Sequence, residues 1–176
     1  MITIASALQA VATAAKPWAS LYSDSTAISS AVTFFHLGGL LFAGGLAITS
    51  DRAMFRALRG TDEDRNRLLL DLDNSHSWVL AGLSVIFVSG LLLALSDVKT
   101  FGYSPVYWTK MSLVVLLLLN GLLLQRTERK LRAGSQLIQS TVPRQRLWSR
   151  LRFAAATSMV LWTAIVLAGV ILVESA

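Results

Sequence analysis

Residues 77–96 have the sequence SWVLAGLSVIFVSGLLLALS, which contains no charged residue and no proline. The hydrocarbon core of a bilayer is about 30 Å thick and an α-helix rises about 1.5 Å per residue, so a crossing helix needs about 20 mostly apolar residues. This stretch has that length and composition. It therefore predicts a transmembrane helix.

Three further stretches have the same character, at residues 27–49, 107–124 and 153–173. Pro17, Pro105 and Pro143 all lie outside the four stretches, where a missing backbone N–H does no harm. We therefore predict an all-α integral membrane protein. Its residues 27–176 are expected to form one domain, an up-and-down four-helix bundle.

The composition excludes several classes of protein. Among the 176 residues, 54% are hydrophobic, only 15% are charged and none is cysteine. So much apolar surface excludes disorder, and the lack of cysteine excludes disulfide scaffolds, thiolate metal sites and iron–sulfur clusters. The sequence also lacks a P-loop, a Gly-x-Ser-x-Gly elbow, a His-Glu-x-x-His motif and a Rossmann fingerprint. No enzyme class is recognisable, which leaves electron transfer open.

The cations lie mostly on one side of the predicted bundle. Five follow the first stretch and eight follow the third, whereas only Lys16, Lys99 and Lys110 fall on the other side. Because cytoplasmic loops are rich in Lys and Arg, both termini are expected on the outer side of a bacterial cytoplasmic membrane. The net charge of +6 then indicates contact with anionic lipid, and no nucleic-acid partner is expected.

Residues 1–26 are expected to lie apart from the bundle, as an amphipathic segment on the outer surface. Ala, Ile, Leu and Val are interleaved there with Ser, Thr and Gln. This pattern predicts a short surface helix that ends at Pro17. A flexible terminus is the alternative.

Helical extensions are expected on the cytoplasmic side. Residues 51–59 and 125–132 continue the first and third stretches as far as a following glycine. Residues 61–64, Thr-Asp-Glu-Asp, have the pattern of a helix N-cap with acids in the first turn. The opposite charges of Glu128 and Arg132, in the extension of the third stretch, are spaced i,i+4.

Each stretch carries a polar residue in a band near the middle of the bilayer. A rise of about 1.5 Å per residue from the outer edge places His36, Ser89, Asn120 and Thr163 at depths of about 12–20 Å. Polar groups at this depth are expected to point into the bundle and to find partners there.

His36 is the most informative of these residues. A neutral imidazole near the midplane can ligate a haem iron or relay a proton, and an ionisable group at this depth is a functional hypothesis by default. The alternative is a hydrogen-bonded histidine that braces the helices, for example through Asn120. His76, at the cytoplasmic edge of the second stretch, is a weaker metal ligand. The two histidines differ in depth by roughly 18 Å, so one iron does not take both.

Two further candidates lie near His36. Gly39 belongs to a cluster of four glycines, which either lets another helix approach closely or leaves a slot for a flat ligand. Lys110 lies one turn inside the third stretch. It either extends outward to the membrane surface or turns inward and contacts an anionic group, such as a haem propionate, or a quinone oxygen.

The sequence around these residues resembles known membrane proteins. The resemblance rests on HLGGLLFAGGL at 36–46 followed by Asp51-Arg52, on GLLLAL at 90–95, and on YWTK at 107–110 followed by Asn120. These runs resemble small bacterial four-helix proteins related to the membrane domain of the copper-resistance protein D (CopD). HemJ-type protoporphyrinogen oxidases are a more distant likeness, with a His on the first span and a Lys opening the third. That likeness implies a b-type haem near His36 and Lys110.

Three functions are therefore considered. The leading one is a small redox-type membrane protein that holds a haem b, or contacts a quinone, through His36, with Lys110 neutralising an anionic group. Asn120, Ser89 and Thr163 would supply supporting hydrogen bonds. The second is a structural or accessory subunit of a larger membrane complex, or a homo-oligomer, which small residues on the first and fourth stretches favour. The third is a proton or ion pathway through the polar band.

Overall fold

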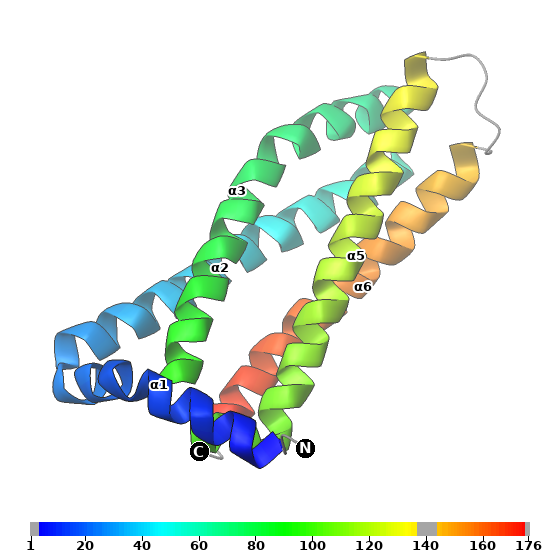
Figure 1. Cartoon of the computed structure of the whole chain (residues 1–176). Coiled ribbons are helices and arrows are strands. Elements are labelled where there is room, and N and C mark those ends of the chain that lie inside the picture. Colours follow the sequence, from blue (N-terminus) through cyan, green and yellow to red (C-terminus); the bar gives the residue numbers. More distant parts are fainter. Residues whose placement is uncertain (1–3, 137–143, 175–176) are drawn as a thin grey trace.

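The computed structural model describes residues 4–136 and 144–174, apart from the side chains of residues 4, 62, 66, 69–77, 132–136 and 144. Nearly all of the described residues are helical. Figure 1 shows four long helices that run side by side: α2 (Thr26–Arg59), α3 (Asp62–Ser96), α5 (Pro105–Gln136) and α6 (Arg144–Glu174). Two shorter helices, α1 (Ile4–Asp24) and α4 (Val98–Tyr103), complete the described chain.

Each of the four predicted stretches lies within one of the long helices. All four helices contain a segment long and apolar enough to cross a membrane, namely Thr26–Arg59, Trp78–Ser96, Pro105–Leu131 and Gln145–Glu174. The expected extensions also form, because α2 and α5 continue as unbroken helices well past their apolar stretches. The prediction of an all-α chain with four long apolar helices is therefore confirmed.

The long helices follow an up-and-down course, in which successive helices run in opposite directions (Figure 1). α2 packs along α3, α5 packs along α6, and α2 also contacts α6. α3 and α5 form no comparable interface. The spatial order of the helices is thus α3–α2–α6–α5, and the bundle is least closely packed on the side where α3 and α5 would meet.

α2 shows how the long helices divide into an inner and an outer face. Its inner face carries the buried residues Val32, Gly39, Ala43, Met54 and Ala57. On the opposite face, Phe34 and Leu41 are 71% and 79% exposed. Large exposed apolar side chains also occur on α3, α5 and α6. Helix surfaces of this kind are typical of contact with lipid chains, because water would disfavour so much exposed apolar area.

Small residues let α2 and α3 approach each other closely. A Cβ at Gly39 would lie 2.9 Å from Cγ1 of Ile86, and a Cβ at Gly82 would lie 2.8 Å from Cβ of Ala43. A larger residue at either glycine would therefore displace the facing helix. This supports the packing role of the glycine cluster. It is also a correction, because Ile86 fills the space at Gly39 that was considered as a slot for a flat ligand.

Two apolar cores fill the bundle. The central core consists of Ala43, Leu117, Leu161, Trp162 and Ile165. The second core lies among the helical extensions and consists of Met54, Ala57, Leu68, Leu131, Leu147, Trp148, Leu151 and Ala155. The extensions are therefore packed against one another as a continuation of the bundle. The end of the molecule that they form is called the basic end below, because most of the cations lie on it.

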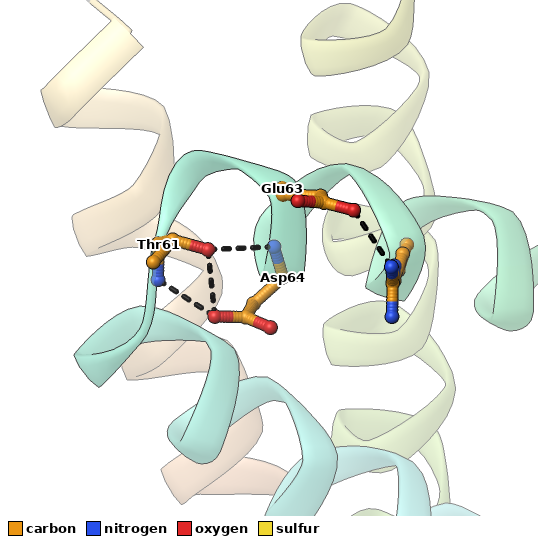
Figure 2. Close-up of polar contacts among 4 residues, drawn as sticks. Thr61, Glu63 and Asp64 are labelled. Carbon is orange, nitrogen blue, oxygen red and sulfur yellow. Dashed lines mark hydrogen bonds and ion pairs between the residues drawn. The ribbon is translucent and has the colours of Figure 1, made fainter.

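Local hydrogen bonds fix the turn between α2 and α3. α2 ends where the N–H of Gly60 donates to the carbonyl of Ala57, at 3.1 Å. α3 begins with the capping box shown in Figure 2: Thr61 Oγ1 accepts from the Asp64 N–H at 3.3 Å, and the Asp64 carboxylate accepts from the Thr61 N–H at 2.7 Å. Glu63 then pairs with Arg67 at 2.6 Å. The predicted N-cap at residues 61–64 is confirmed.

α1 lies across the end of the bundle opposite the basic end (Figure 1). Trp18 Nε1 donates to the Leu92 carbonyl of α3 at 2.8 Å, and Leu8 packs against Gly102 of α4. The prediction that this helix ends at Pro17 is wrong, because α1 continues to Asp24. Proline removes one backbone hydrogen bond from a helix, and here the contacts of α1 with α3 and α4 hold the helix on both sides of it.

The sequence pattern did not predict α4. Its first turn is held by Asp97, whose carboxylate accepts from the N–H of Thr100 at 3.1 Å. α5 then starts directly with Pro105, a residue that suits the first turn of a helix because no N–H is needed there. The connection from α3 to α5 is thus a short capped helix.

Candidate functional site

His36 lies on the inner face of α2, against α3. Its Nδ1 is 3.1 Å from Oγ of Ser89, a residue that is only 4% exposed. The Ser89 hydroxyl donates its single hydrogen to the carbonyl of Val85, at 2.6 Å. The same hydroxyl lies 3.2 Å from the carbonyl of Ile86, and when it donates to either carbonyl it accepts from an imidazole that carries its hydrogen on Nδ1. Nε2 is left with a lone pair that can accept a hydrogen bond or bind a metal.

Gly90 allows this contact. A Cβ at Gly90 would lie 3.1 Å from Cε1 of His36, so the imidazole edge packs directly against the backbone of α3. The pair Ser89-Gly90 therefore both orients the ring and makes room for it. His36 is half-buried in this position, and its ring braces α2 against α3.

Lys110 extends from α5 toward α6 and the interior of the bundle. Its Nζ lies 3.4 Å from the point that a Cβ at Gly169 would occupy, and its charge acts on the His36 ring. Among the residues whose side chains the structure describes, Lys110 has no ion-pair or hydrogen-bond partner. The half-buried Lys110 therefore takes the inward orientation, the second of the two that its sequence position left open.

Asn120 does not join His36. Its Nδ2 donates to the Ala154 carbonyl at 2.9 Å, so it ties α5 to the backbone of α6. Bracing of His36 through Asn120 is a wrong expectation, because Ser89 takes that place. The hydrogen-bonding capacity of Asn120 contributes to helix packing.

Thr163 does not join the site either. It is exposed, and its hydroxyl donates to the Met159 carbonyl of its own helix at 2.9 Å. The buried face of α6 is defined by Leu161, Ile165, Ala168 and Leu172, which are spaced at i, i+4, i+7 and i+11. At about 100° per residue, Thr163 falls on the opposite face. The expectation that it points into the bundle is wrong.

His76 lies in the middle of α3, but its side chain is outside the described residues. The thirteen positions between His76 and Ser89 correspond to about 20 Å along the helix. The two histidines are therefore far apart along the bundle, as the sequence spacing indicates.

Around His36, these residues supply one candidate axial ligand for a haem iron, the imidazole of His36 itself. The described part of the chain contains no group of three His, Cys, Asp or Glu side chains placed to share a metal ion. Ile86 fills the space at Gly39, and the ring of Trp162 lies 3.4 Å from a Cβ at Gly44, whereas a Cβ at Gly38 or Gly45 would meet no atom within 4 Å. The residues near the middle of the bundle thus include one imidazole and one ammonium group.

A second set of buried polar residues was not recognised in the sequence. Asp51 of α2 is 5% exposed, and Ser158 of α6, which acts on its carboxyl group, is 8% exposed. Glu128 of α5 is 2% exposed and lies within electrostatic range of Asp51. The burial of Asp51 could have been predicted from its helical spacing, because it shares the inner face of α2 with Met54 and Ala57. The other partner of the predicted ion pair, Arg132, has its side chain outside the described residues.

Comparison of the chain with protein-family models, with curated proteins and with solved structures finds no match. The resemblance to the CopD-related and HemJ-type proteins therefore stays a prediction.

Proposed function

We propose that the chain is a multi-pass protein of a bacterial cytoplasmic membrane, with both termini on the outer side. Support comes from the four apolar helices, from their large exposed apolar side chains, and from the concentration of cations at the basic end. Cytoplasmic segments carry an excess of Lys and Arg, so the basic end faces the cytoplasm. α1 then lies at the outer surface of the membrane.

Within this membrane protein, we propose that His36 and Lys110 bind the head of a quinone. The observation that carries the proposal is that Lys110 extends into the bundle near Gly169, close enough to His36 for its charge to act on the imidazole. Nε2 of His36 accepts a hydrogen bond from a hydroquinone hydroxyl, and the ammonium of Lys110 donates to a quinone oxygen. A Ser89 hydroxyl that donates to a backbone carbonyl of α3 favours the tautomer that leaves Nε2 free. The reduced ligand can therefore hydrogen-bond to His36, and the oxidised ligand can hydrogen-bond to Lys110.

The arrangement of the helices supports a ligand that comes from the bilayer. His36 and Lys110 point inward yet remain half-buried, so the interior around them is not sealed. α3 and α5 form no extensive interface. A quinone is soluble in lipid, so its head would reach the site laterally from the bilayer.

The test is direct binding of a short-chain benzoquinone to the purified full-length chain in lipid nanodiscs, followed by calorimetry. His36→Ala and Lys110→Met are each expected to weaken binding by about tenfold or more, because a buried polar contact is worth about 1–3 kcal/mol. Thr163→Ala is the matched control, since it removes a hydroxyl at similar depth that faces away from the site. The proposal fails if the unaltered chain does not bind the quinone, or if His36→Ala binds it equally well.

Further measurements on the same purified protein distinguish the quinone site from the other proposed functions. A haem absorption band that disappears in His36→Ala would favour haem over quinone. A particle larger than one chain in native mass spectrometry, without quinone binding, would favour an accessory subunit or a homo-oligomer. An ion pathway is less supported, because the central core around Ala43 and Trp162 lies between His36 and Asp51. These two residues are about 22 Å apart along α2.

A further inference from the structure

α2 carries an exposed row of three arginines at the basic end, away from the His36 site. Arg52, Arg56 and Arg59 are spaced at i, i+4 and i+7, so their side chains leave the helix on one face over about 10 Å. All three are exposed. They are called the arginine row below.

The arginine row differs from the two arginines that follow on α3. Arg65 Nη2 donates to the Leu58 carbonyl at 3.3 Å and its guanidinium lies 5.7 Å from the ring centre of Trp148, while Arg67 pairs with Glu63. No guanidinium of the arginine row has an ion-pair or hydrogen-bond partner among the residues whose side chains are described. Their charges are therefore available to a partner outside the chain.

The arginine row continues the outer apolar face of α2. Phe34, Gly38, Leu41 and Gly45 lie on the same face as the row, because each is separated from the next by three or four residues and the spacing continues to Arg52. Phe34 and Leu41 are strongly exposed, and a Cβ at Gly38 or Gly45 would meet no atom within 4 Å. An apolar strip that ends at a group of free cations matches the shape and polarity of a phospholipid.

We propose that the arginine row binds the phosphate headgroup of an anionic phospholipid whose acyl chains lie along Leu41 and Gly45. Guanidinium groups suit this role because they are always charged and make paired hydrogen bonds to phosphate oxygens. A cation near an anionic membrane surface adds roughly 1 kcal/mol to the attraction. This inference depends on membrane insertion but not on the quinone site, so either can fail without the other.

The experiment measures retention of phosphatidylglycerol by the purified full-length chain in detergent, by native mass spectrometry across a lipid titration. Phosphatidylcholine serves as the uncharged reference. The double variant Arg52→Gln with Arg56→Gln is expected to lower the apparent affinity for phosphatidylglycerol by about 10–30-fold. Lys16→Gln with Lys99→Gln is the matched control, because it removes the same charge from exposed positions at the opposite end. This control is expected to retain the affinity of the unaltered chain.

Two further measurements are made. The first tests whether loss of binding reflects loss of charge or disruption of the fold, and the second tests whether the site binds a lipid or free phosphate. Arg52→Lys with Arg56→Lys keeps the charge and is expected to retain most of the binding. Inorganic phosphate alone is expected to compete poorly, because it lacks acyl chains for the apolar strip. Equal phosphatidylglycerol retention by the unaltered chain and the double glutamine variant would overturn the proposal. So would full competition by inorganic phosphate, or an equal loss in the Lys16 and Lys99 control.

Discussion

Gly38 and Gly39 are neighbours on α2 with opposite surroundings. A Cβ at Gly39 would lie 2.9 Å from Cγ1 and 3.4 Å from the backbone nitrogen of Ile86, whereas a Cβ at Gly38 would meet no atom within 4 Å. Gly39→Leu is expected to push α2 away from α3 and to lower the free energy of unfolding by about 1–3 kcal/mol, as overpacking does. Gly38→Leu is the matched control and is expected to lack this penalty.

Comparing the two variants cancels the gain in helix propensity that both share. Replacing glycine by leucine raises helix propensity by roughly the same amount, up to about 1 kcal/mol, at either position. The difference between the two unfolding midpoints in detergent therefore reports the contact with Ile86. Indistinguishable midpoints would contradict the close approach of α2 and α3.

At the scale of one helix, the start of α3 depends on a carboxylate outside the apolar segment. Hydrogen bonds from the backbone N–H and then the hydroxyl of Thr61 lower the pKa of Asp64 below its ordinary value of about 3.9. A carboxyl group with a lowered folded-state pKa stabilises the fold fully above its unfolded-state pKa. That contribution is lost as the pH falls through the lower, folded-state pKa.

This capping box gives a prediction for pH. The Asp64 carboxyl, followed by NMR in the full-length chain, is expected to titrate with a midpoint below about 3.9. Hydrogen-exchange protection of the first turn of α3 should fall over the same range, because protonation removes an acceptor from the Thr61 N–H. Asp64→Asn should abolish this pH dependence. A midpoint at or above the ordinary aspartate value would contradict the box.

At the scale of the whole molecule, the distribution of charge predicts the orientation in the membrane. The chain has no cysteine, so single cysteines can be introduced as reporters. Ala14→Cys on α1 should react with a membrane-impermeant maleimide in intact cells. Ser149→Cys, near the start of α6 at the basic end, should react only after permeabilisation. Both positions are exposed, so the difference reports sidedness.

The opposite labelling pattern would place the basic end outside and overturn the proposed orientation. Labelling of both positions in intact cells would contradict membrane crossing by α2, α3, α5 and α6. Either result would leave the internal contacts of the bundle unaffected, because those contacts do not depend on which side is outer.

The depth of a residue along its helix could be predicted from the sequence, but the direction of its side chain could not. Counting along each apolar stretch placed both Ser89 and Thr163 in the polar band. Ser89 meets His36, whereas Thr163 lies on the outer face of α6. Depth follows from a fixed rise per residue. Direction depends on which face of the helix another helix covers, and long apolar stretches carry little periodic pattern to indicate that face.

The sequence by itself determined the four apolar helices, their extensions and the cap of α3. These features follow from hydropathy, rise per residue and hydrogen bonds between residues close in the chain, so no distant contact is needed to produce them. Only the tertiary structure decided that Lys110 turns inward, that Asp51 and Glu128 are buried and that α1 continues past Pro17. In each case the deciding free energy comes from contacts between helices that are far apart in the sequence, and those contacts exist only once the bundle has assembled.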